Sequence, residues 1–141
     1  MRVEDYLNQA HRLDNRIKFK MRELDEMRET VADIRPPVLS ERVQTSRQSD
    51  PPFVRALERI EEVQEKMEEE VKTLVRLKEQ INSVIDSVED SDKRTVLRCR
   101  YIHRMKWVDI GFELGIDEKT ARRWCRAALD EIVLPTDAIM I

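Results

Sequence analysis

The stretch that decides the fold is WVDIGFELGIDEKTARRWCRAALDEI, residues 107–132, in which Gly115 separates two short helical patterns. Four residues of the first pattern recur at the i, i+3, i+4 and i+7 spacing of one helix face: Trp107, Ile110, Gly111 and Leu114. Gly115 suits the left-handed conformation that ends a helix, and Gly111 lets another helix approach closely because it has no side chain. The stretch therefore predicts a helix over 107–114, a tight turn, and a final helix that Asp117 can cap.

The final helix of this stretch has two chemically different faces. At about 100° per residue, four cationic side chains fall within an arc of roughly 100°: Lys119, Arg122, Arg123 and Arg126. The opposite arc holds the residues expected to pack: Ala121, Trp124, Cys125 and Ala128. We expect Trp124 to anchor the core of a small domain. A helix of this kind after a tight turn is what a helix-turn-helix presents to the major groove, and a solvated basic face is the plainer alternative.

The charge of the chain is unevenly distributed. Its 141 residues carry a formal net charge of -3. Residues 1–91 contain 16 Lys and Arg against 21 Asp and Glu, whereas residues 92–131 contain 10 against 7. The basic surplus thus coincides with the quoted stretch, where an electrostatic footprint for nucleic acid is expected. With 39% charged residues, 5% aromatic residues and two Gly, the composition favours long exposed helices over an all-β fold.

The first 90 residues carry two heptad patterns. Over residues 3–34, apolar residues alternate at spacings of three and four with Lys20 as the exception, which predicts one long coiled-coil helix. A second long helix over 52–88 is predicted by apolar residues at seven-residue intervals: Phe53, Ile60, Met67, Leu74, Ile81 and Val88. The proline-rich segment 35–52 predicts a loop. We expect an antiparallel hairpin whose remaining apolar stripe is covered by another copy of the chain.

These patterns predict an all-α fold in three parts: a long, coiled-coil-like helical hairpin, a small helix-turn-helix domain and a tail. Residues 1–90 form the hairpin and the oligomerisation region. Residues 91–134 form the helix-turn-helix domain, which begins with a helix over 92–104 capped by Ser91 or Asp90. Residues 135–141 form the tail.

Other classes of protein are not favoured by the sequence. The N-terminus is too polar for a signal peptide and no run of about 18 apolar residues occurs, so we expect a cytoplasmic protein with no membrane partner. Cys99 and Cys125 lack CxxC spacing, which predicts buried, reduced thiols and no metal site. The chain has no glycine-rich phosphate loop and no nucleophile with a base and an orienting group, so neither an enzyme nor a cofactor is expected.

The stretch DKRTVLRCRYIHRMKWVDIGFELGIDEKTARRWCRAALDEI, residues 92–132, resembles region 4 of bacterial sigma-70 factors. The resemblance rests on six residues: Trp107, Ile110, Leu114, Gly115, Ile116 and Thr120. Gly111 stands where that family usually has Ala, and Ala121 where it has a larger aliphatic residue. Nothing in the chain resembles sigma region 2, the part that melts promoter DNA. The resemblance therefore implies an accessory regulator and not a complete sigma factor.

The whole chain also resembles small phage and prophage proteins of Gram-positive bacteria. In these proteins a "YLNQxxxLDxxI" helix, here YLNQAHRLDNRI from Tyr6, precedes a second long helix and a terminal region-4-like domain. Such proteins are regarded as transcriptional regulators similar to late-gene activators. This resemblance implies a protein of the bacterial host cytoplasm that acts on phage genes.

The sequence thus predicts a sequence-specific DNA-binding transcriptional regulator of phage or prophage genes, without promoter-melting sigma activity. Base-edge contacts are predicted for four residues: Lys119, Thr120, Arg122 and Arg123. Phosphate contacts are predicted for three others: Arg126, Arg104 and Lys106. Double-stranded DNA is the expected partner, RNA polymerase is a further candidate, and residues 1–90 are expected to form a homodimer or a higher homo-oligomer. Two alternatives stay open: a small terminase-like DNA-packaging subunit, and an adaptor that binds RNA polymerase without contacting DNA.

Overall fold

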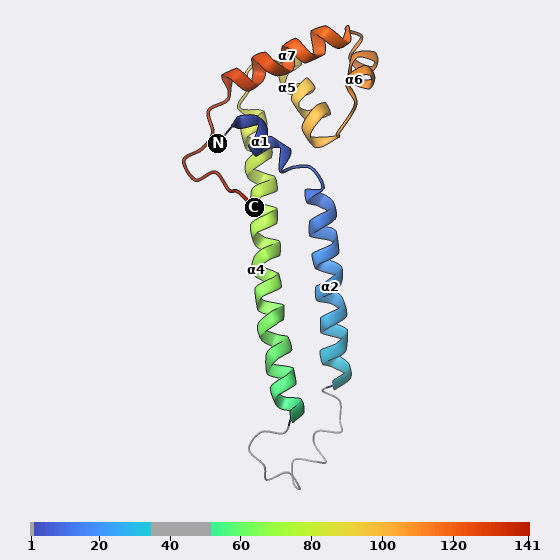
Figure 1. Ribbon diagram of the computed structural model, residues 1–141, viewed down its shortest axis with the longest axis vertical. Helices are drawn as coiled ribbons and strands as arrows, with labels where there is room; N and C mark the ends of the chain where they lie inside the picture. Colours follow the sequence, from blue (N-terminus) through green and yellow to red (C-terminus); the bar gives the residue numbers. More distant parts are fainter. Residues whose placement is uncertain (1, 35–51) are drawn as a thin grey trace. The chain divides into compact units, whose positions relative to one another are not determined.

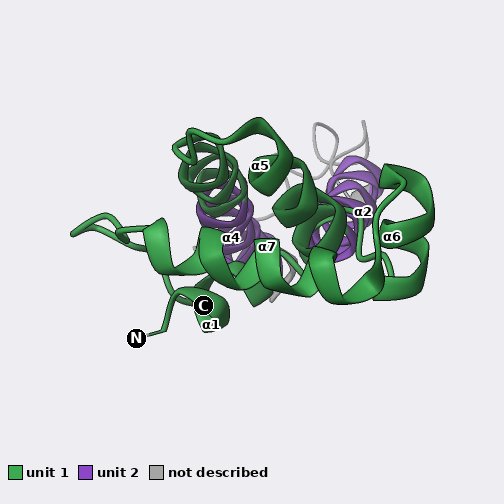
Figure 2. Ribbon diagram, turned by 90° about the horizontal axis from the view of Figure 1, so that it is seen from above, with its two compact units in different colours: residues 1–14, 75–141 green, residues 15–74 purple. Residues whose placement is uncertain are grey.

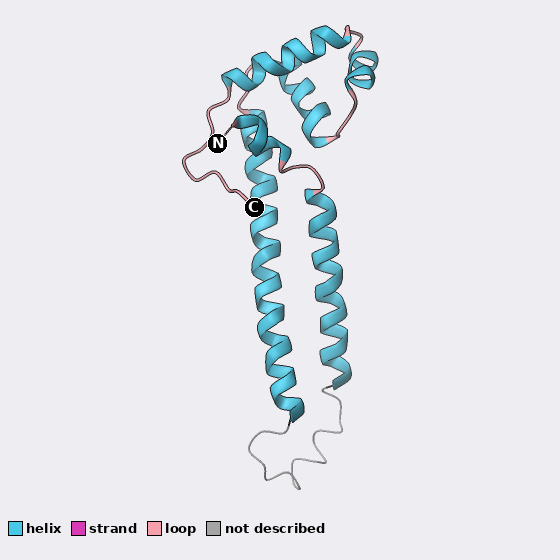
Figure 3. Ribbon diagram, in the orientation of Figure 1, coloured by secondary structure: helices cyan, strands magenta, loops and turns pink. Residues whose placement is uncertain are grey.

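The computed structural model describes residues 2–34 and 52–141 (Figure 1). Every regular element in these residues is a helix (Figure 3), which confirms the predicted all-α fold. In chain order they are α1 (Val3–Asn8), α2 (Leu13–Ile34), α4 (Pro52–Asp86), α5 (Ser91–Leu97), the π-helical turn η1 (Arg98–Ile102), α6 (Trp107–Leu114) and α7 (Glu118–Glu131). None of the helices in these two ranges is both long enough and apolar enough to cross a membrane. The loop predicted over 35–52 lies outside the described residues, except for Pro52, the first residue of α4.

The chain divides into two compact units, which Figure 2 colours separately. Unit 1 comprises residues 1–14 and 75–141, and unit 2 is Asn15–Leu74. The boundary therefore falls inside α4 and differs from the division at residue 90 that the sequence led us to expect. The last turns of α4 lie in unit 1, where four of their apolar side chains are buried: Leu77, Ile81, Val84 and Ile85. Val88, which follows the helix, is buried as well.

Unit 2 is an antiparallel pair made of α2 and the first turns of α4. Lys20 Nζ lies 2.9 Å from Glu70 Oε2, and Arg28 lies 3.2 Å from Glu68 Oε1, so residue numbers rise along α2 as they fall along α4. Lys20 is the residue that interrupts the heptad pattern. Its hydrogen bond to Glu70 raises the pKa of its amine, so the cation is accommodated at the edge of the helix pair.

The apolar stripe of unit 2 is only partly covered by this pairing. Leu24, Met67 and Leu74 are buried. Six further residues of the stripe are half-buried: Ile17, Met27, Val31, Leu57, Ile60 and Val71. Phe19, Met21 and Val63 are exposed. Partial burial leaves apolar surface in contact with water, which costs free energy in proportion to its area.

The prediction of one continuous helix over 3–34 is wrong, because the helix is interrupted between α1 and α2. Residues 9–12 form successive turns, and Arg12 takes a left-handed backbone conformation with φ of 62°. Hydrogen bonds here join residues three apart, as from Ala10 N to Leu7 O at 3.0 Å, in place of the α-helical ladder. Tyr6 and Leu7 are both fully buried in unit 1. The 3.5-residue apolar pattern did not reveal the break because each helix satisfies it separately.

The helix predicted over 92–104 is shorter than expected and changes type partway. It begins as predicted, since the Asp90 side chain accepts hydrogen bonds from the backbone N–H groups of Asp92 and Lys93. After α5, η1 continues in π-helical geometry. His103 N then donates to Arg98 O, and Met105 N donates to Cys99 O at 2.9 Å. Arg104 between them has φ of 59°, a conformation that usually belongs to glycine at the end of a helix.

The turn between α6 and α7 has the predicted geometry. Gly115 ends α6 with φ of 68° and ψ of 34°, and Ile116 N donates to Gly111 O at 2.9 Å. The sequence predicted that another helix approaches closely at Gly111. A Cβ atom there would lie 2.7 Å from Ile116 O in the turn and 3.4 Å from Glu118 N at the start of α7, so the missing side chain allows the turn and the start of α7 to approach α6. Asp117 occupies the capping position of α7, but its side chain makes no capping hydrogen bond.

Residues 137–141, predicted as part of a separate tail, pack within unit 1. The Gln9 side chain donates to Ile139 O at 2.9 Å and accepts from Ile141 N at 2.9 Å. The Gln80 side chain accepts from Ile139 N at 2.9 Å and donates to Asp137 O at 3.2 Å. Tyr6 also donates its hydroxyl to Gln80 Oε1 at 2.8 Å. Two glutamine side chains thus hold the backbone of the C-terminal segment beside α1 and α4.

Candidate nucleic-acid interface

Helix α7 buries one face and exposes the other. It packs against α5 and α6, with Ala121, Cys125 and Ala128 buried beneath it. The small side chains on this face allow close packing of the helices. The exposed face carries the four predicted cations: Lys119, Arg122, Arg123 and Arg126.

Trp124, which we expected to anchor the core, is half-buried and is not among the residues that pack against the cluster formed by η1, α6 and α7. The buried cluster between η1, α6 and α7 consists of Cys99, Ile110 and Ala121. Four partly buried side chains pack around it: Met105, Trp107, Leu114 and Ile116. Trp107, from the start of α6, is thus the tryptophan that packs against this cluster, because the turn at Gly115 sets α6 against α7.

The exposed cations of α7 differ in what they contact. Arg122 forms an ion pair with Glu118, 2.6 Å away and one turn earlier on the same helix, and its guanidinium lies 5.9 Å from the centre of the Trp107 ring. Lys119, Arg123 and Arg126 have no ion-pair partner among residues 2–34 and 52–141. These three side chains are therefore the ones that can bind an external anion without first breaking an internal pair.

The remaining predicted site residues also lie in unit 1. Thr120 is half-buried on the first turn of α7, whereas Arg104 and Lys106 are exposed in the segment that joins η1 to α6. Sequence reasoning missed Arg100, on η1. Its guanidinium lies 4.6 Å from the centre of the Trp107 ring and donates a hydrogen bond to Met105 O at 3.0 Å. Such stacking holds a guanidinium in place while leaving N–H groups available.

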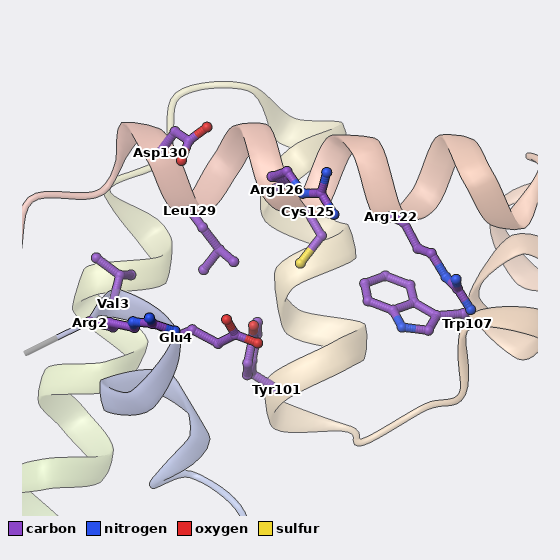
Figure 4. Close-up of a pocket in the computed structure, with 10 residues that line it drawn as sticks. All are labelled: Arg2, Val3, Glu4, Tyr101, Trp107, Arg122, Cys125, Arg126, Leu129 and Asp130. Atoms are coloured by element: carbon purple, nitrogen blue, oxygen red, sulfur yellow. The ribbon is translucent and has the colours of Figure 1, made fainter.

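A groove of about 670 Å³ runs along one side of α7 (Figure 4). Five residues of α7 line it at helical spacing: Arg122, Cys125, Arg126, Leu129 and Asp130. Arg2, Val3 and Glu4, at the start of α1, form the opposite wall, and Tyr101 and Trp107 complete the lining. No sequence signal placed Arg2 beside α7, because more than a hundred residues separate them.

The inner part of this groove is uncharged at neutral pH. Burial raises the pKa of the Cys125 thiol to about 11, although its hydrogen bond with Tyr101 acts in the opposite direction. Burial also raises the pKa of the Tyr101 hydroxyl. Both groups keep their protons, so the electrostatic character of the groove is set by the charged residues along its rim.

These observations define an all-α protein in which one compact unit exposes a cationic helix face. The chain belongs to the family described as "Protein of unknown function (DUF722)", whose family model matches residues 2–133. The match includes every helix described above and excludes the segment 137–141. No curated protein and no solved structure matches the chain.

Proposed function

We propose that the protein is a sequence-specific DNA-binding transcriptional regulator of phage or prophage genes that works in the cytoplasm of a bacterial host and does not melt promoters. The observation that carries the proposal is the exposed face of α7, on which Lys119, Arg123 and Arg126 lack internal ion-pair partners in the described residues. In this proposal α6, the Gly115 turn and α7 are a helix-turn-helix. The left-handed Gly115 and the close approach at Gly111 support it.

The dimensions and charges of α7 suit the major groove of DNA. Its 14 residues make a rod about 21 Å long, which can lie in a groove about 12 Å wide. Lys119, Thr120 and Arg123, in its first turns, are assigned to base edges. Arg126, with Arg104 and Lys106, is assigned to phosphates. Arg122 can donate hydrogen bonds to a base only after its ion pair with Glu118 breaks. We therefore expect it to contribute less to base recognition than the sequence alone predicted.

Unit 2 is assigned to self-association in the same proposal. Its partly exposed apolar stripe, described above, supports a homodimer in which a second copy covers residues such as Ile17 and Ile60. A dimer would link two copies of α7. Two linked sites bind DNA more tightly than one by a factor of about 10² to 10⁴, when both can engage together.

DNA binding is tested by titrating the full chain with fragments of its native phage genome and with random duplexes at several salt concentrations. We expect Arg126→Ala to weaken binding to all duplexes and to reduce the slope of log K against log salt by about 0.9. Arg123→Ala should cost about 1 to 3 kcal/mol on the preferred site only. Arg16→Ala, which removes an exposed cation from unit 2, is the matched control. If both α7 variants bind as the wild type does, the proposed interface is wrong.

A second candidate function is an adaptor that binds RNA polymerase, and one observation favours it. On α6, Phe112 is 91% exposed and Val108 is 64% exposed, and they are neighbours at i, i+4. Apolar side chains on such a face are typical of protein contacts. A Phe112→Ser variant that loses polymerase binding but keeps DNA affinity would support the adaptor role. Loss of DNA affinity in the same variant would instead assign Phe112 to the fold or to the DNA interface.

A further inference from the structure

Three features that the sequence does not signal border one small cavity in unit 1. They are the non-helical turns over 9–12, the π-helical turn η1, and the left-handed Arg104. The cavity has a volume of about 190 Å³ and is lined by four residues: Asn8, His11, Arg100 and Arg104. Non-glycine residues in left-handed conformations cost free energy, and they gather at functional sites. π-Helical turns also occur frequently at such sites.

The lining of this cavity is made of hydrogen-bond donors. An amide, an imidazole and two guanidinium groups face it, and none of the four lining residues is acidic. Arg100 is held by its hydrogen bond to Met105 O and by the Trp107 ring, so its remaining N–H groups are positioned in advance. Arg104 has no ion-pair partner in the part of the chain that the structure describes.

His11 supplies a second, independent observation. Its Nδ1 atom is buried and has no hydrogen-bond partner among residues 2–34 and 52–141. Buried polar atoms almost always have a partner, and an unpaired one in a polar cavity indicates a place for a ligand or an ordered water. A ligand that accepts hydrogen bonds would satisfy the two arginines and, in the tautomer that carries its proton on Nδ1, His11 as well.

We infer that this cavity, defined by Asn8, His11, Arg100 and Arg104, binds a phosphate group. A phosphate offers several acceptor oxygens in a tetrahedral arrangement, which matches donors that come from three different segments of the chain. Guanidinium groups bind phosphate oxygens in pairs, so Arg100 and Arg104 provide most of the recognition. The phosphate can belong to the DNA backbone, in which case the inference rests on the proposed function, or to a small phosphate ester.

The site is tested first with inorganic phosphate. Because Arg100 stacks on Trp107, an anion in the cavity should change the fluorescence of that indole. The second tryptophan is removed by Trp124→Phe, which leaves Trp107 as the reporter. We expect a saturable change with phosphate and none with sodium chloride at the same ionic strength. Arg104→Gly and His11→Ala should each raise the phosphate Kd at least about tenfold, the size of effect expected for a charge-assisted hydrogen bond.

Two controls keep this test interpretable. Arg16→Ala removes an exposed cation from unit 2 and should leave the phosphate Kd unchanged. Thermal unfolding of each variant shows whether it is folded, and Arg104→Gly is suited to this purpose because glycine accepts the local backbone conformation. A folded Arg104→Gly protein that binds phosphate as tightly as the wild type overturns the inference, as does a wild type that responds equally to phosphate and chloride.

The source of the phosphate is decided by titrations with duplex DNA. If the group belongs to DNA, Arg104→Gly and His11→Ala should weaken DNA binding, and inorganic phosphate should compete with DNA more strongly than chloride does. If phosphate binds but DNA affinity is unaffected, the ligand is a small phosphate ester. The proposed function fails separately, because Arg123→Ala and Arg126→Ala test α7 and neither residue lines this cavity.

Discussion

Replacing Gly111 by Ala should destabilise unit 1, although alanine is the better helix former. The added Cβ atom would lie 2.7 Å from Ile116 O and 3.4 Å from Glu118 N. Both contacts are with backbone, so no side-chain rotation can relieve them. A carbon and a carbonyl oxygen rarely approach within about 3.3 Å, so the turn must retreat from α6 by about 0.6 Å. That movement would pull Ala121, on α7, away from Cys99 and Ile110 in the buried cluster.

The expected cost follows from two opposing terms. Overpacking in a closely packed region costs about 1 to 3 kcal/mol, whereas alanine in place of glycine inside a helix gains about 0.5 to 1 kcal/mol. With the middle of each range, the net loss is about 1 kcal/mol. For a unit of this size, each kcal/mol lowers the midpoint of thermal unfolding by about 4 to 8 °C.

Both tryptophans of the chain, Trp107 and Trp124, lie in unit 1, so intrinsic fluorescence reports on this unit while circular dichroism follows all the helices. Urea unfolding monitored by fluorescence should show the loss in Gly111→Ala. Gly115 provides a contrast, because a Cβ there meets no atom within 4 Å and its constraint is the φ of 68°. Gly115→Asn should therefore be tolerated and Gly115→Val should cost more than about 1 kcal/mol. A Gly111→Ala protein as stable as the wild type would refute the close approach of α6 to the turn.

Three further outcomes are expected. Arg104→Gly should raise the stability of unit 1 by about 0.5 to 1 kcal/mol, as measured by thermal melts. The free energy gained by removing the left-handed strain at Arg104 exceeds the entropy cost of ordering a glycine, which is more flexible in the unfolded chain. Burial, with the nearby Asp137 carboxylate, raises the pKa of Tyr6 to about 12 from 10.0, so the folded state holds a proton that the unfolded state has lost. The contribution of Tyr6 to the free energy of unfolding should therefore be fully present below pH 10 and be lost as the pH rises from 10 to 12. In urea titrations, Tyr6→Phe should remove that part of the loss at high pH. Since the pKa of Cys125 is about 11 instead of 9.0, its alkylation at pH 8 should be about 100-fold slower in the folded protein than after unfolding, as mass spectrometry can follow.

The parts of the fold that were predictable are those with strong local signals. The bounds of α6, the left-handed Gly115 and the cap at Asp90 follow from residues a few positions apart, because backbone geometry and capping are local effects. The all-α class follows from apolar periodicity and low glycine content. In the candidate site, the two faces of α7 were predicted from its own sequence for the same reason.

Features that depend on distant residues could not be predicted in this way. The break before α2 involves QAHR, residues 9–12, which contain neither proline nor glycine, and it follows a short helix whose Tyr6 and Leu7 are buried among distant segments of unit 1. The π-helical turn has no composition signature. Arg2 in the groove and Gln80 beneath Ile139 reach their partners only after the chain has folded back, so no window of sequence contains both members of either contact.

Unit 1 is built from both ends of the chain, which affects the order in which the protein can fold during synthesis. Residues 1–14 leave the ribosome before the end of α4 that holds Tyr6, and long before residues 137–141, which hold Gln9. Unit 2 is made from one uninterrupted segment, so its two helices can pair while translation continues. The contacts of α1 with α4 and with residues 137–141 can therefore form only after unit 2 has been synthesised. Folding of unit 1 thus depends on long-range contacts, which form slowly because distant segments must meet.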